Sequence, residues 1–486
     1  MKKGTTKVNI VFQAIYQIVI FVTPLVISPY LSRVLGATQL GIYAFSNSIA
    51  YYFLIASNLG ISKYGQRMIA QTRDDKEKLR VNFWSLYTLH AFASFFSQAV
   101  YVILLFTVFK SQITIYSITF IYVLSATFDI TWLFYGRQNF KFVTTVGTFL
   151  AILKLSLIFV FVKSENNLTT YMEITYLTTF LSQVILFIAA IREVKPIKLT
   201  FSDIKPHIAP ILYFALAVIA VSLYNVFDKT LLGLMSTKEN VAYYEFASRI
   251  VNVPMVLCGV LGTVLFPKIC ELNAEGKIEQ AKNYSLVSLM LITFFSVGAT
   301  FGILAVGKPF SIYYYGSDFV TSGYCMMALS PIIYFVSIGD LFRTQYLIPQ
   351  KKDKKYVFSI IIAAITNIVI SLALIPILDI YGAIIGTIAA EIVGQIMQIF
   401  FARKYISPRI VIGNLIPFLV IGSIMYGSIV LIGNYMGDSL LNLVFEILLG
   451  IVVYSALGSI YIFRISPSRE FYKVFFHLKK GIEKEK

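Results

Sequence analysis

The sequence predicts an all-α polytopic membrane protein with about 14 transmembrane helices. Hydrophobic residues make up 58% of the 486 positions and charged residues only 13%. Apolar stretches of about 20 residues, the length a helix needs to cross a bilayer, follow one another along the whole chain. The connections between them are too short to hold a soluble domain. These observations exclude a water-soluble enzyme or binding module.

The predicted spans follow from a hydropathy window of about 19 residues. The first one begins after three lysines, but its apolar stretch runs to about Leu31 without a small-residue cleavage site, so we interpret it as a helix and not as a signal peptide. The spans begin near Val8, Gln39, Asn82, Gln112, Phe142, Thr170, Ala209, Val241, Asn283, Val320, Tyr356, Tyr381, Ile412 and Leu441.

The basic residues are distributed unevenly between the two sides of this arrangement. If the N-terminus is cytoplasmic, 32 of the 41 lysines and arginines fall on the inner side, five on the outer side and four within spans. This asymmetry is the one that the positive-inside rule describes. We therefore expect a multi-pass protein of the cytoplasmic membrane with both termini in the cytoplasm. The net charge of +17 then reflects topology and needs no nucleic-acid partner.

Weak internal matches indicate a repeat of six spans. The matched segments are Tyr43–Ile49 with Tyr244–Ile250, and Tyr122–Ser125 with Tyr334–Ser337, the latter two followed thirteen residues later by Gln138 and Gln350. Because six is even, the halves keep the same orientation, as parallel repeats do. We expect an N-terminal lobe over residues 1–205 (helices 1 to 6), a C-terminal lobe over 206–405 (helices 7 to 12), and helices 13 and 14 with a basic cytoplasmic tail over 406–486.

Cofactor chemistry has no signal in this sequence. The three cysteines and three histidines are scattered, without the spacing of a disulfide framework or a zinc site, so we expect no metal and no cofactor. A nucleotide-binding loop of the G-x-x-x-x-G-K-[ST] kind is absent. Driven transport would then draw on an ion gradient, with H⁺ and Na⁺ both open as coupling ions, or on consumption of the transported substrate.

Several motifs resemble those of a known family. They are Leu31–Gly36 with Gly41-Ile-Tyr43, Asn58–Arg67, Trp132–Lys141, Asp228-Lys229 with Gly233, Gly262–Pro267, and Gly386–Glu391. Together they resemble the bacterial polysaccharide repeat-unit flippases for O-antigen and capsule, of the Wzx type, in the multidrug/oligosaccharidyl-lipid/polysaccharide exporter superfamily. The resemblance implies a MATE-like fold of two six-helix lobes in a V.

The resemblance also implies a function and a site. Members of this type move undecaprenyl-pyrophosphate-linked oligosaccharides from the inner to the outer leaflet by alternating access, alongside polysaccharide polymerase and assembly proteins. The related lipid-precursor flippases keep a cavity-facing arginine in helix eight, and Arg249 stands at the matching place. Their helix-one arginine has no counterpart, because Arg33 lies later in the helix, nearer the outer surface.

Ionisable residues inside apolar spans are functional candidates, because each costs at least about 2.5–3.5 kcal/mol at the bilayer centre. Arg249 is expected either to pair with Asp228 or Glu245 or also to face the cavity, where its planar fork of donors suits a pyrophosphate. Asp340 and Arg343, one turn apart, predict a local ion pair. The substrate-binding candidates are Arg249, Asp228, Lys229, Lys154, Glu391, Arg33, Lys63 and Arg67.

Alternative interpretations remain. Lys63 and Arg67 lie at cytoplasmic helix ends, which topology alone explains, or they form a basic vestibule for an anionic headgroup. An ion-coupled multidrug or organic-cation antiporter of the same fold would need a carboxylate-rich cavity to attract cations. A membrane-embedded glycan polymerase would need a larger external segment than the connection of about a dozen residues around Gly307 to Phe319, so we expect no enzyme.

The charge distribution generates a topology prediction. Reporter domains fused after Lys78, Lys198 and Lys354 should read as cytoplasmic, and those near Asn166 and Gly316 as external. Alkaline phosphatase and fluorescent-protein fusions measure this directly. Finding Asn166 and Lys198 on the same side would contradict the arrangement of helices proposed above.

Overall fold

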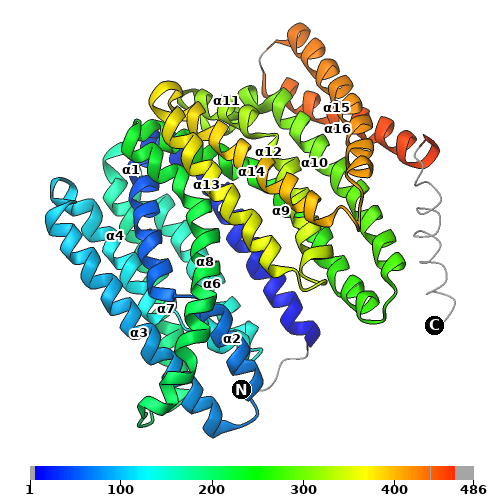
Figure 1. Ribbon diagram of the computed structural model, residues 1–486. Coiled ribbons are helices and arrows are strands. Elements are labelled where there is room, and N and C mark those ends of the chain that lie inside the picture. The colour runs from blue at the N-terminus through cyan, green and yellow to red at the C-terminus, as the bar shows by residue number, and fades with distance from the viewer. Residues whose placement is uncertain (1–5, 438, 466–486) are drawn as a thin grey trace. The chain divides into compact units, whose positions relative to one another are not determined.

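The computed structural model describes residues 6–437 and 439–465, and within these ranges every regular element is helical (Figure 1). The chain divides into two compact units, unit 1 over Met1–Ala242 and unit 2 over Tyr243–Lys486. The boundary falls inside one long helix, and α8 packs against α1, α2 and α3 within unit 1. The lobe boundary expected between residues 205 and 206 was inferred from the six-span repeat, whereas the two units are defined by their internal contacts. That lobe boundary stays a prediction. The predicted basic tail lies outside the described residues.

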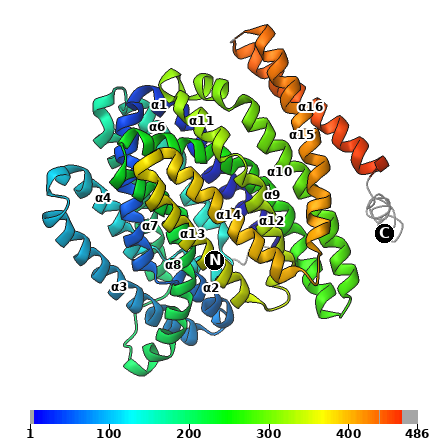
Figure 2. The same ribbon diagram turned by 45° about the horizontal axis from the view of Figure 1, so that its top comes forward.

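The helices are long and joined by short turns. Those of the first unit are α1 Thr6–Asn58, α2 Ile61–Thr72, α3 Lys76–Thr107, α4 Ile113–Ser125, α5 Thr131–Gly136, α6 Phe140–Phe161, α7 Leu168–Glu193 and α8 Phe201–Met235. Next come α9 Lys238–Ala274, α10 Ile278–Tyr315, α11 Val320–Leu329, α12 Ile332–Phe342, α13 Asp353–Leu378, α14 Ile380–Ala402, α15 Pro408–Met436 and α16 Leu440–Ile460. Within the second unit, α13 and α14 run side by side along their length (Figure 2).

The expected number of about 14 membrane spans is not confirmed by the described residues. Eleven helices of the described residues are long and apolar enough to cross a bilayer, or twelve if the bent pair of α11 and α12 is one span. One of them runs over residues 15–72, although α1 is broken at Gly36, where φ is 71° and ψ is 173°. A continuous helix of the 53 residues of α1 would be about 80 Å long, far more than about 30 Å of hydrocarbon. The break thus separates two predicted spans, but the count of fourteen is not confirmed.

Two spans six positions apart in the predicted order are interrupted. One comprises α4, the 3₁₀ turn η2 (Ala126–Phe128) and α5, and the other comprises α11, α12 and the π-helical turn η5 (Arg343–Leu347), bent by 46° between α11 and α12. Both end in the same type of cap. A residue other than glycine with positive φ, Gln138 or Lys351, is followed by a residue whose backbone N–H donates to the carbonyl group five residues earlier. These bonds run from Asn139 N to Phe134 O (2.8 Å) and from Lys352 N to Leu347 O (2.7 Å).

The shared cap supports the internal repeat and shows where it is imperfect. Gln138 lies 13 residues after Ser125, whereas Lys351 lies 14 residues after Ser337. A π turn closes its hydrogen bond over one residue more than an α turn, so η5 accounts for the extra position. The two spans therefore end in the same way, with one more residue before the cap in the second, but they break at different places, after Ser125 in the first and after Leu329 in the second.

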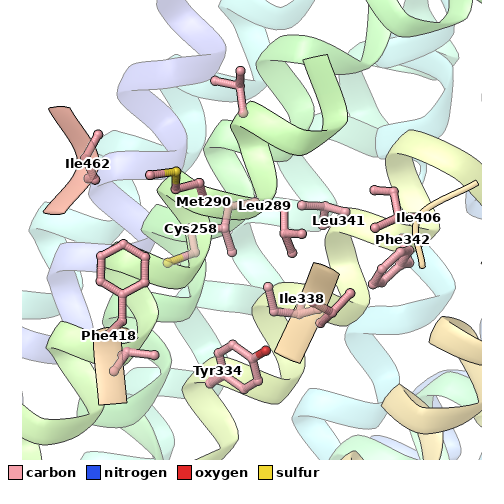
Figure 3. Packing of buried hydrophobic residues seen from close by; sticks show 14 of the residues in the cluster. Cys258, Leu289, Met290, Tyr334, Ile338, Leu341, Phe342, Ile406, Phe418 and Ile462 are labelled. Atoms are coloured by element: carbon pink, nitrogen blue, oxygen red, sulfur yellow. The ribbon is translucent and has the colours of Figure 1, made fainter. Parts of the chain in front are cut away.

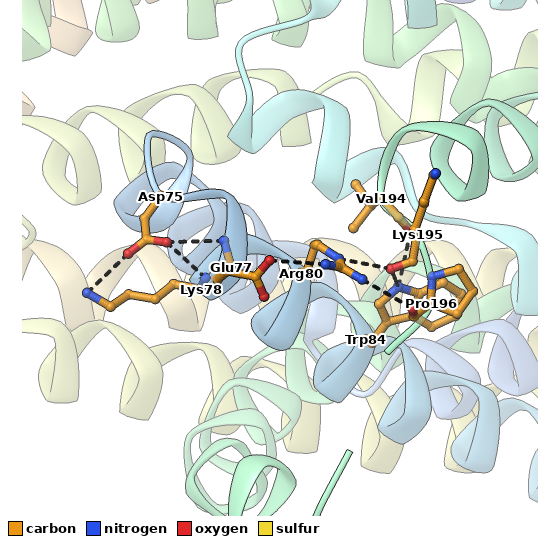
Figure 4. A network of polar contacts seen from close by, with 8 residues as sticks. All are labelled: Asp75, Glu77, Lys78, Arg80, Trp84, Val194, Lys195 and Pro196. Carbon is orange, nitrogen blue, oxygen red and sulfur yellow. Dashed lines mark hydrogen bonds and ion pairs between the residues drawn. The ribbon is translucent and has the colours of Figure 1, made fainter. Parts of the chain in front are cut away.

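In unit 1, the start of α3 is tied to the segment after α7 (Figure 4). Asp75 caps α3 by accepting hydrogen bonds from the backbone N–H groups of Lys78 and Glu77, and these bonds, with the Lys78 ammonium, lower the pKa of the Asp75 carboxyl. Arg80 donates to the carbonyls of Lys195 and Pro196 at 3.2 and 3.3 Å. The connections α2–α3 and α7–α8 therefore lie at the same end of unit 1, as their shared basic character predicts.

The apolar core of unit 2 joins residues from α9, α10, α12, α14, α15 and α16 and from the π-helical turns η5 and η6 (Tyr461–Ile465). Cys258, Met290, Ile338, Phe418 and Ile462 are all buried in one cluster (Figure 3). Large apolar side chains also remain exposed around both units, for example Phe92, Phe95 and Phe96 on α3. Exposed aromatic surface of this kind is what a lipid-facing helix presents.

Two glycines allow α1 to approach the turn between α8 and α9. A Cβ built on Gly41 would lie 1.7 Å from the carbonyl oxygen of Lys238, and one on Gly233 would lie 1.9 Å from the Phe45 ring. The Lys238 ammonium in turn sits 3.7 Å from the centre of the Phe45 ring and donates to the Gly233 carbonyl at 2.6 Å. Close backbone contact through small residues is a general means of joining helices in membranes.

We predict that Gly41→Ala destabilises unit 1 by about 3 kcal/mol or more, because the methyl group would meet backbone that cannot rotate away. The control is Gly302→Ala, since a Cβ there meets nothing within 4 Å. Thermal unfolding of the detergent-solubilised variants measures both. Equal unfolding temperatures for the two variants would contradict the close approach.

Candidate functional site

A pocket of about 240 Å³, mostly apolar but with an ion pair in its lining, lies within unit 2, among α9, α10, α12 and η5. Its lining combines an ion pair with small and hydroxyl-bearing residues: Cys258, Gly259, Gly262, Ser337, Asp340, Arg343 and Thr344 are among them. The glycines form the α9 wall, and a Cβ on Gly262 would come within 3.3 Å of the Thr344 hydroxyl. Because these α9 residues are glycines, they leave room for the polar groups of the tenth predicted span.

The ion pair in this pocket is the one that the sequence predicts. Arg343 Nη2 lies 2.7 Å from Asp340 Oδ1, and Nη1 donates to the Tyr356 hydroxyl at 3.4 Å. The Arg343 Nε is buried without a hydrogen-bond partner among the described residues. Buried arginine donors normally have hydrogen-bond partners, so this nitrogen is an exception within the described residues.

Arg249 occupies the same face of α9, two turns before the pocket. Its Nε donates to Glu245 Oε1 at 3.0 Å, and the guanidinium carbon lies 4.8 Å from the centre of the Phe246 ring. Positions 249, 256 and 260 share one helix face, since they are spaced by about two and three turns. Val256 and Val260, which also line the pocket, are 49% and 51% exposed. This half-open face therefore connects the arginine with the pocket along about 10 Å of helix.

The other candidates lie on other helices. Glu391, on α14 in unit 2, is half-buried. In unit 1, Asp228 is buried on α8, Lys229 beside it is half-buried, and Lys154 is half-buried on α6. The α8 segment around Asp228 is held to α1 by Thr230, whose hydroxyl lies 2.9 Å from that of Tyr52 and 3.2 Å from that of Ser48. Asp228 thus sits at a polar seam between α8 and α1.

The three basic candidates nearer the helix ends are exposed. Arg33 donates to the carbonyl of Pro29 in its own helix at 2.8 Å. Lys63 and Arg67 lie on α2, and the Arg67 guanidinium stacks 5.7 Å from the Tyr64 ring and 5.6 Å from the Phe214 ring. Arg33, Lys63 and Arg67 thus all belong to unit 1. Among the candidates in unit 2, Arg249 lies on a helix face that leads into the pocket around Asp340 and Arg343.

The sequence interpretation did not single out Cys258, Ser337 or Thr344 as site residues. A usable signal existed, because positions 337, 340 and 344 recur every three or four residues and so place polar groups on one face of an apolar span. Glu446 in α16 was missed as well, although it is the kind of intramembrane carboxylate that deserves a functional hypothesis.

The fold is that of known membrane transporters. A solved lipid II flippase MurJ in an inward closed conformation matches 94% of this chain and 99% of its own, with a TM-score of 0.76 and 16% identity. A multidrug resistance MATE family transporter in an inward-facing conformation matches 82% of this chain and 98% of its own, with a TM-score of 0.60 and 15% identity. This protein is thus a multi-pass membrane protein of the MurJ and MATE-like fold class, as the sequence predicts.

The family follows from the sequence comparison. The chain belongs to the polysaccharide biosynthesis protein family, whose model matches residues 7–273. A protein of Escherichia coli (strain K12), named as an O-antigen transporter, is 22% identical over 413 residues, which cover 82% of this chain and 96% of the relative. The resemblance to polysaccharide repeat-unit flippases is thereby confirmed.

We predict that Asp340→Asn and Arg343→Gln each lower the stability of the protein and that the double variant recovers part of the loss. Removing one partner leaves the other charge uncompensated in the pocket. The side chains are 34% and 37% exposed, so each single loss should be about 1–2 kcal/mol, less than for a fully buried pair. Thermal unfolding in a double-mutant cycle measures the coupling. Strictly additive losses would mean that the pair contributes nothing.

Proposed function

We propose that this protein is a flippase for polysaccharide biosynthesis, which moves undecaprenyl-pyrophosphate-linked oligosaccharide repeat units from the inner to the outer leaflet of the cytoplasmic membrane. Family membership and the O-antigen transporter relative support a lipid-linked glycan as the substrate class. The observation that carries the proposal within this chain is Arg249, an intramembrane cation on the helix face that leads into the pocket around Asp340 and Arg343. Transport of an intact substrate forms and breaks no covalent bond, so we assign no catalytic step.

The chemistry of the substrate explains why an arginine is needed. A pyrophosphate loses much of its hydration when it leaves the cytoplasmic leaflet, and this cost must be offset by charged donors inside the protein. Arginine stays charged when buried and presents parallel N–H groups that match two phosphate oxygens. The Phe246 ring, which stacks on the guanidinium, fixes the direction of that fork. Lys63 and Arg67, exposed on α2, would attract the headgroup to the cytoplasmic entrance.

The transport cycle in this proposal is alternating access, in which the substrate site opens to one leaflet at a time. The likeness in fold to a MATE family transporter solved in an inward-facing conformation supports it. The coupling ion, H⁺ or Na⁺, and association with a polysaccharide polymerase or other assembly proteins are further parts of the proposal. Lys154, Asp228, Lys229, Glu391 and Arg33 remain candidates for contacts along the path.

We predict that Arg249→Ala lowers transport about 10- to 100-fold, the effect of losing charge-assisted hydrogen bonds of about 1.5–3 kcal/mol. Arg249→Lys should recover only part, because a point charge replaces a bidentate fork. The matched control is Arg403→Ala, which removes an exposed arginine that also stacks on a phenylalanine three residues earlier, Phe400, at 4.0 Å. The measurement is the appearance of lipid-linked oligosaccharide on the outer face of cells or proteoliposomes.

A second variant separates binding from helix pairing. Glu245→Gln breaks the same ion pair but keeps the arginine, so it should lower transport less than Arg249→Ala does. Equal losses for the two variants would reduce Arg249 to a structural partner of Glu245. Export of organic cations by the unaltered protein and by Arg249→Ala alike, with no glycan transport by either, would favour a multidrug antiporter.

A further inference from the structure

A fully buried histidine lies on α3 in unit 1. Neither ring nitrogen of this residue, His90, has a hydrogen-bond partner among the described residues. Ser94, one turn later on the same face of α3, is also fully buried, and its hydroxyl group is unpartnered within the same part of the chain. A neutral imidazole carries one donor and one acceptor, and burying both unpaired costs free energy. The packing of unit 1 therefore does not account for a histidine at this position.

The segment that faces His90 is the break between α4 and α5. α3 contacts the 3₁₀ turn η2 at this break, and Gln98 Nε2 on α3 donates to the Thr127 hydroxyl at 2.6 Å. The Ala126 carbonyl and the Asp129 carboxylate lie close enough to the His90 ring to interact with it electrostatically, but without a hydrogen bond of good geometry. The interrupted span thus places an anionic side chain beside the buried imidazole.

Asp129 has an oxygen atom available for a further donor. Its Oδ1 accepts from the backbone N–H and from the hydroxyl of Thr131, at 3.1 and 2.7 Å. Both of these bonds end on Oδ1, so Oδ2 can accept from another group. The Asp129 side chain is half-buried, whereas His90 is enclosed. Asp129 is therefore the more accessible member of the pair.

The other ionisable groups of this region are neutral or contact other residues. Phenol groups near Asp129 or His90 come from α1, α3, α4 and α5, and they belong to Tyr16, Tyr87, Tyr122 and Tyr135. Phenols remain neutral at physiological pH. Ionisable groups of α2, α7 and α8 contact other side chains: Arg67 stacks on Tyr64 and Phe214, His207 bonds to Tyr64, Glu193 pairs with Arg137, and Asp228 interacts with Tyr52. Within the described residues, Asp129 is thus the charge that faces His90.

We propose that His90 and Asp129 form a proton-binding site in unit 1 and that H⁺ bound there is the coupling ion of transport. The second part rests on the proposed function, in which H⁺ and Na⁺ are both open. A proton taken up by one ring nitrogen makes the imidazole a cation with two N–H donors, for which Asp129 Oδ2 and the Ala126 carbonyl are the acceptors. The N–H bond is the only bond that forms, and it breaks when the proton returns to water.

The position of Asp129 decides whether His90 holds the proton. An imidazole in an apolar environment favours its neutral form, whereas an opposite charge within about 4–6 Å favours the cation. Asp129 belongs to the break between α4 and α5, so a rearrangement of this break changes its distance from α3. Movement of the interrupted span would thus be linked to uptake or release of one proton.

Titration of His90 in the purified full-length protein tests the site. The chain has only three histidines, so ¹⁵N NMR of histidine-labelled protein in nanodiscs can resolve them, and substitutions of His207 and His477 assign the signals by elimination. We expect His90 to bind one proton between about pH 8 and pH 5. Asp129→Asn keeps an acceptor for Thr131 but removes the charge, so it should lower the pH of half-protonation by about one unit or more.

Transport of lipid-linked oligosaccharide into proteoliposomes tests the coupling. A difference of one pH unit changes the equilibrium of a step coupled to one proton about tenfold, so a pH gradient that is acid on the outer side should stimulate transport. His90→Asn should lose this stimulation. The matched control is His207→Asn, which removes another buried histidine of unit 1, one whose Nδ1 lies 2.9 Å from the Tyr64 hydroxyl. The control should keep the stimulation.

Three results would overturn the proposal. They are a His90 ring that stays neutral down to about pH 4, a titration that is unchanged in Asp129→Asn, and full stimulation by the pH gradient in His90→Asn. If the unaltered protein moves no lipid-linked glycan, the proposed function fails, while the NMR titration still decides the proton site. If His90→Asn does not fold, Asp129→Asn decides: full stimulation of this variant rejects the coupling.

Discussion

Hydrocarbon offers no hydrogen-bond partner, and this constraint decides where the helices of the protein can break and where its charges can stand. The two interrupted spans show the consequence. At the break after α4, the Asp129 carboxylate accepts bonds from the backbone N–H and the hydroxyl of Thr131, at 3.1 and 2.7 Å. At the bend between α11 and α12, the Ser330 hydroxyl donates to the Met327 carbonyl at 2.9 Å, and the Ser330 carbonyl accepts from the Thr300 hydroxyl at 3.1 Å. Polar side chains replace the helical bonds that the breaks remove.

The π turn of unit 2 links this backbone constraint to the candidate site. An inserted residue within a helix turns the following side chains to a new face and widens the backbone hydrogen-bonded ring. Here the insertion coincides with Arg343 and Thr344, which both line the pocket, and with Gln345, which is fully buried. The corresponding span of unit 1 ends in the same cap without a π turn among its described residues. The inserted residue therefore distinguishes the end of this span from that of its counterpart in unit 1.

Some of this structure could be predicted from the sequence because it depends on local properties. Hydropathy locates the helices. The charge asymmetry predicts that the connections α2–α3 and α7–α8 lie on the same side, and the bond from Arg80 to Lys195 joins them. The spacing of Asp340 and Arg343 predicts their ion pair. The pocket could not be predicted, since it joins residues distant in sequence, such as Cys258 with Asp340. Helix periodicity gives little help in this class, because lipid-facing and buried surfaces are both apolar. The break at Gly36 was inferred only as a gap between spans.

The pairing of Arg249 with Glu245 is compatible with substrate binding for an energetic reason. A lone arginine in the membrane is costly, so a resting transporter needs a counter-ion for it. A glutamate one turn before an arginine provides this in the favourable orientation, but such a pair is worth only about 0.3–0.5 kcal/mol when exposed and somewhat more when partly buried. A pyrophosphate offers more negative charge and more oxygens to the same guanidinium. The side chains are 20% and 18% exposed, so exchange requires little further desolvation. In the proposed function, a weak, local partner would keep the arginine in place without withholding it from an anionic substrate.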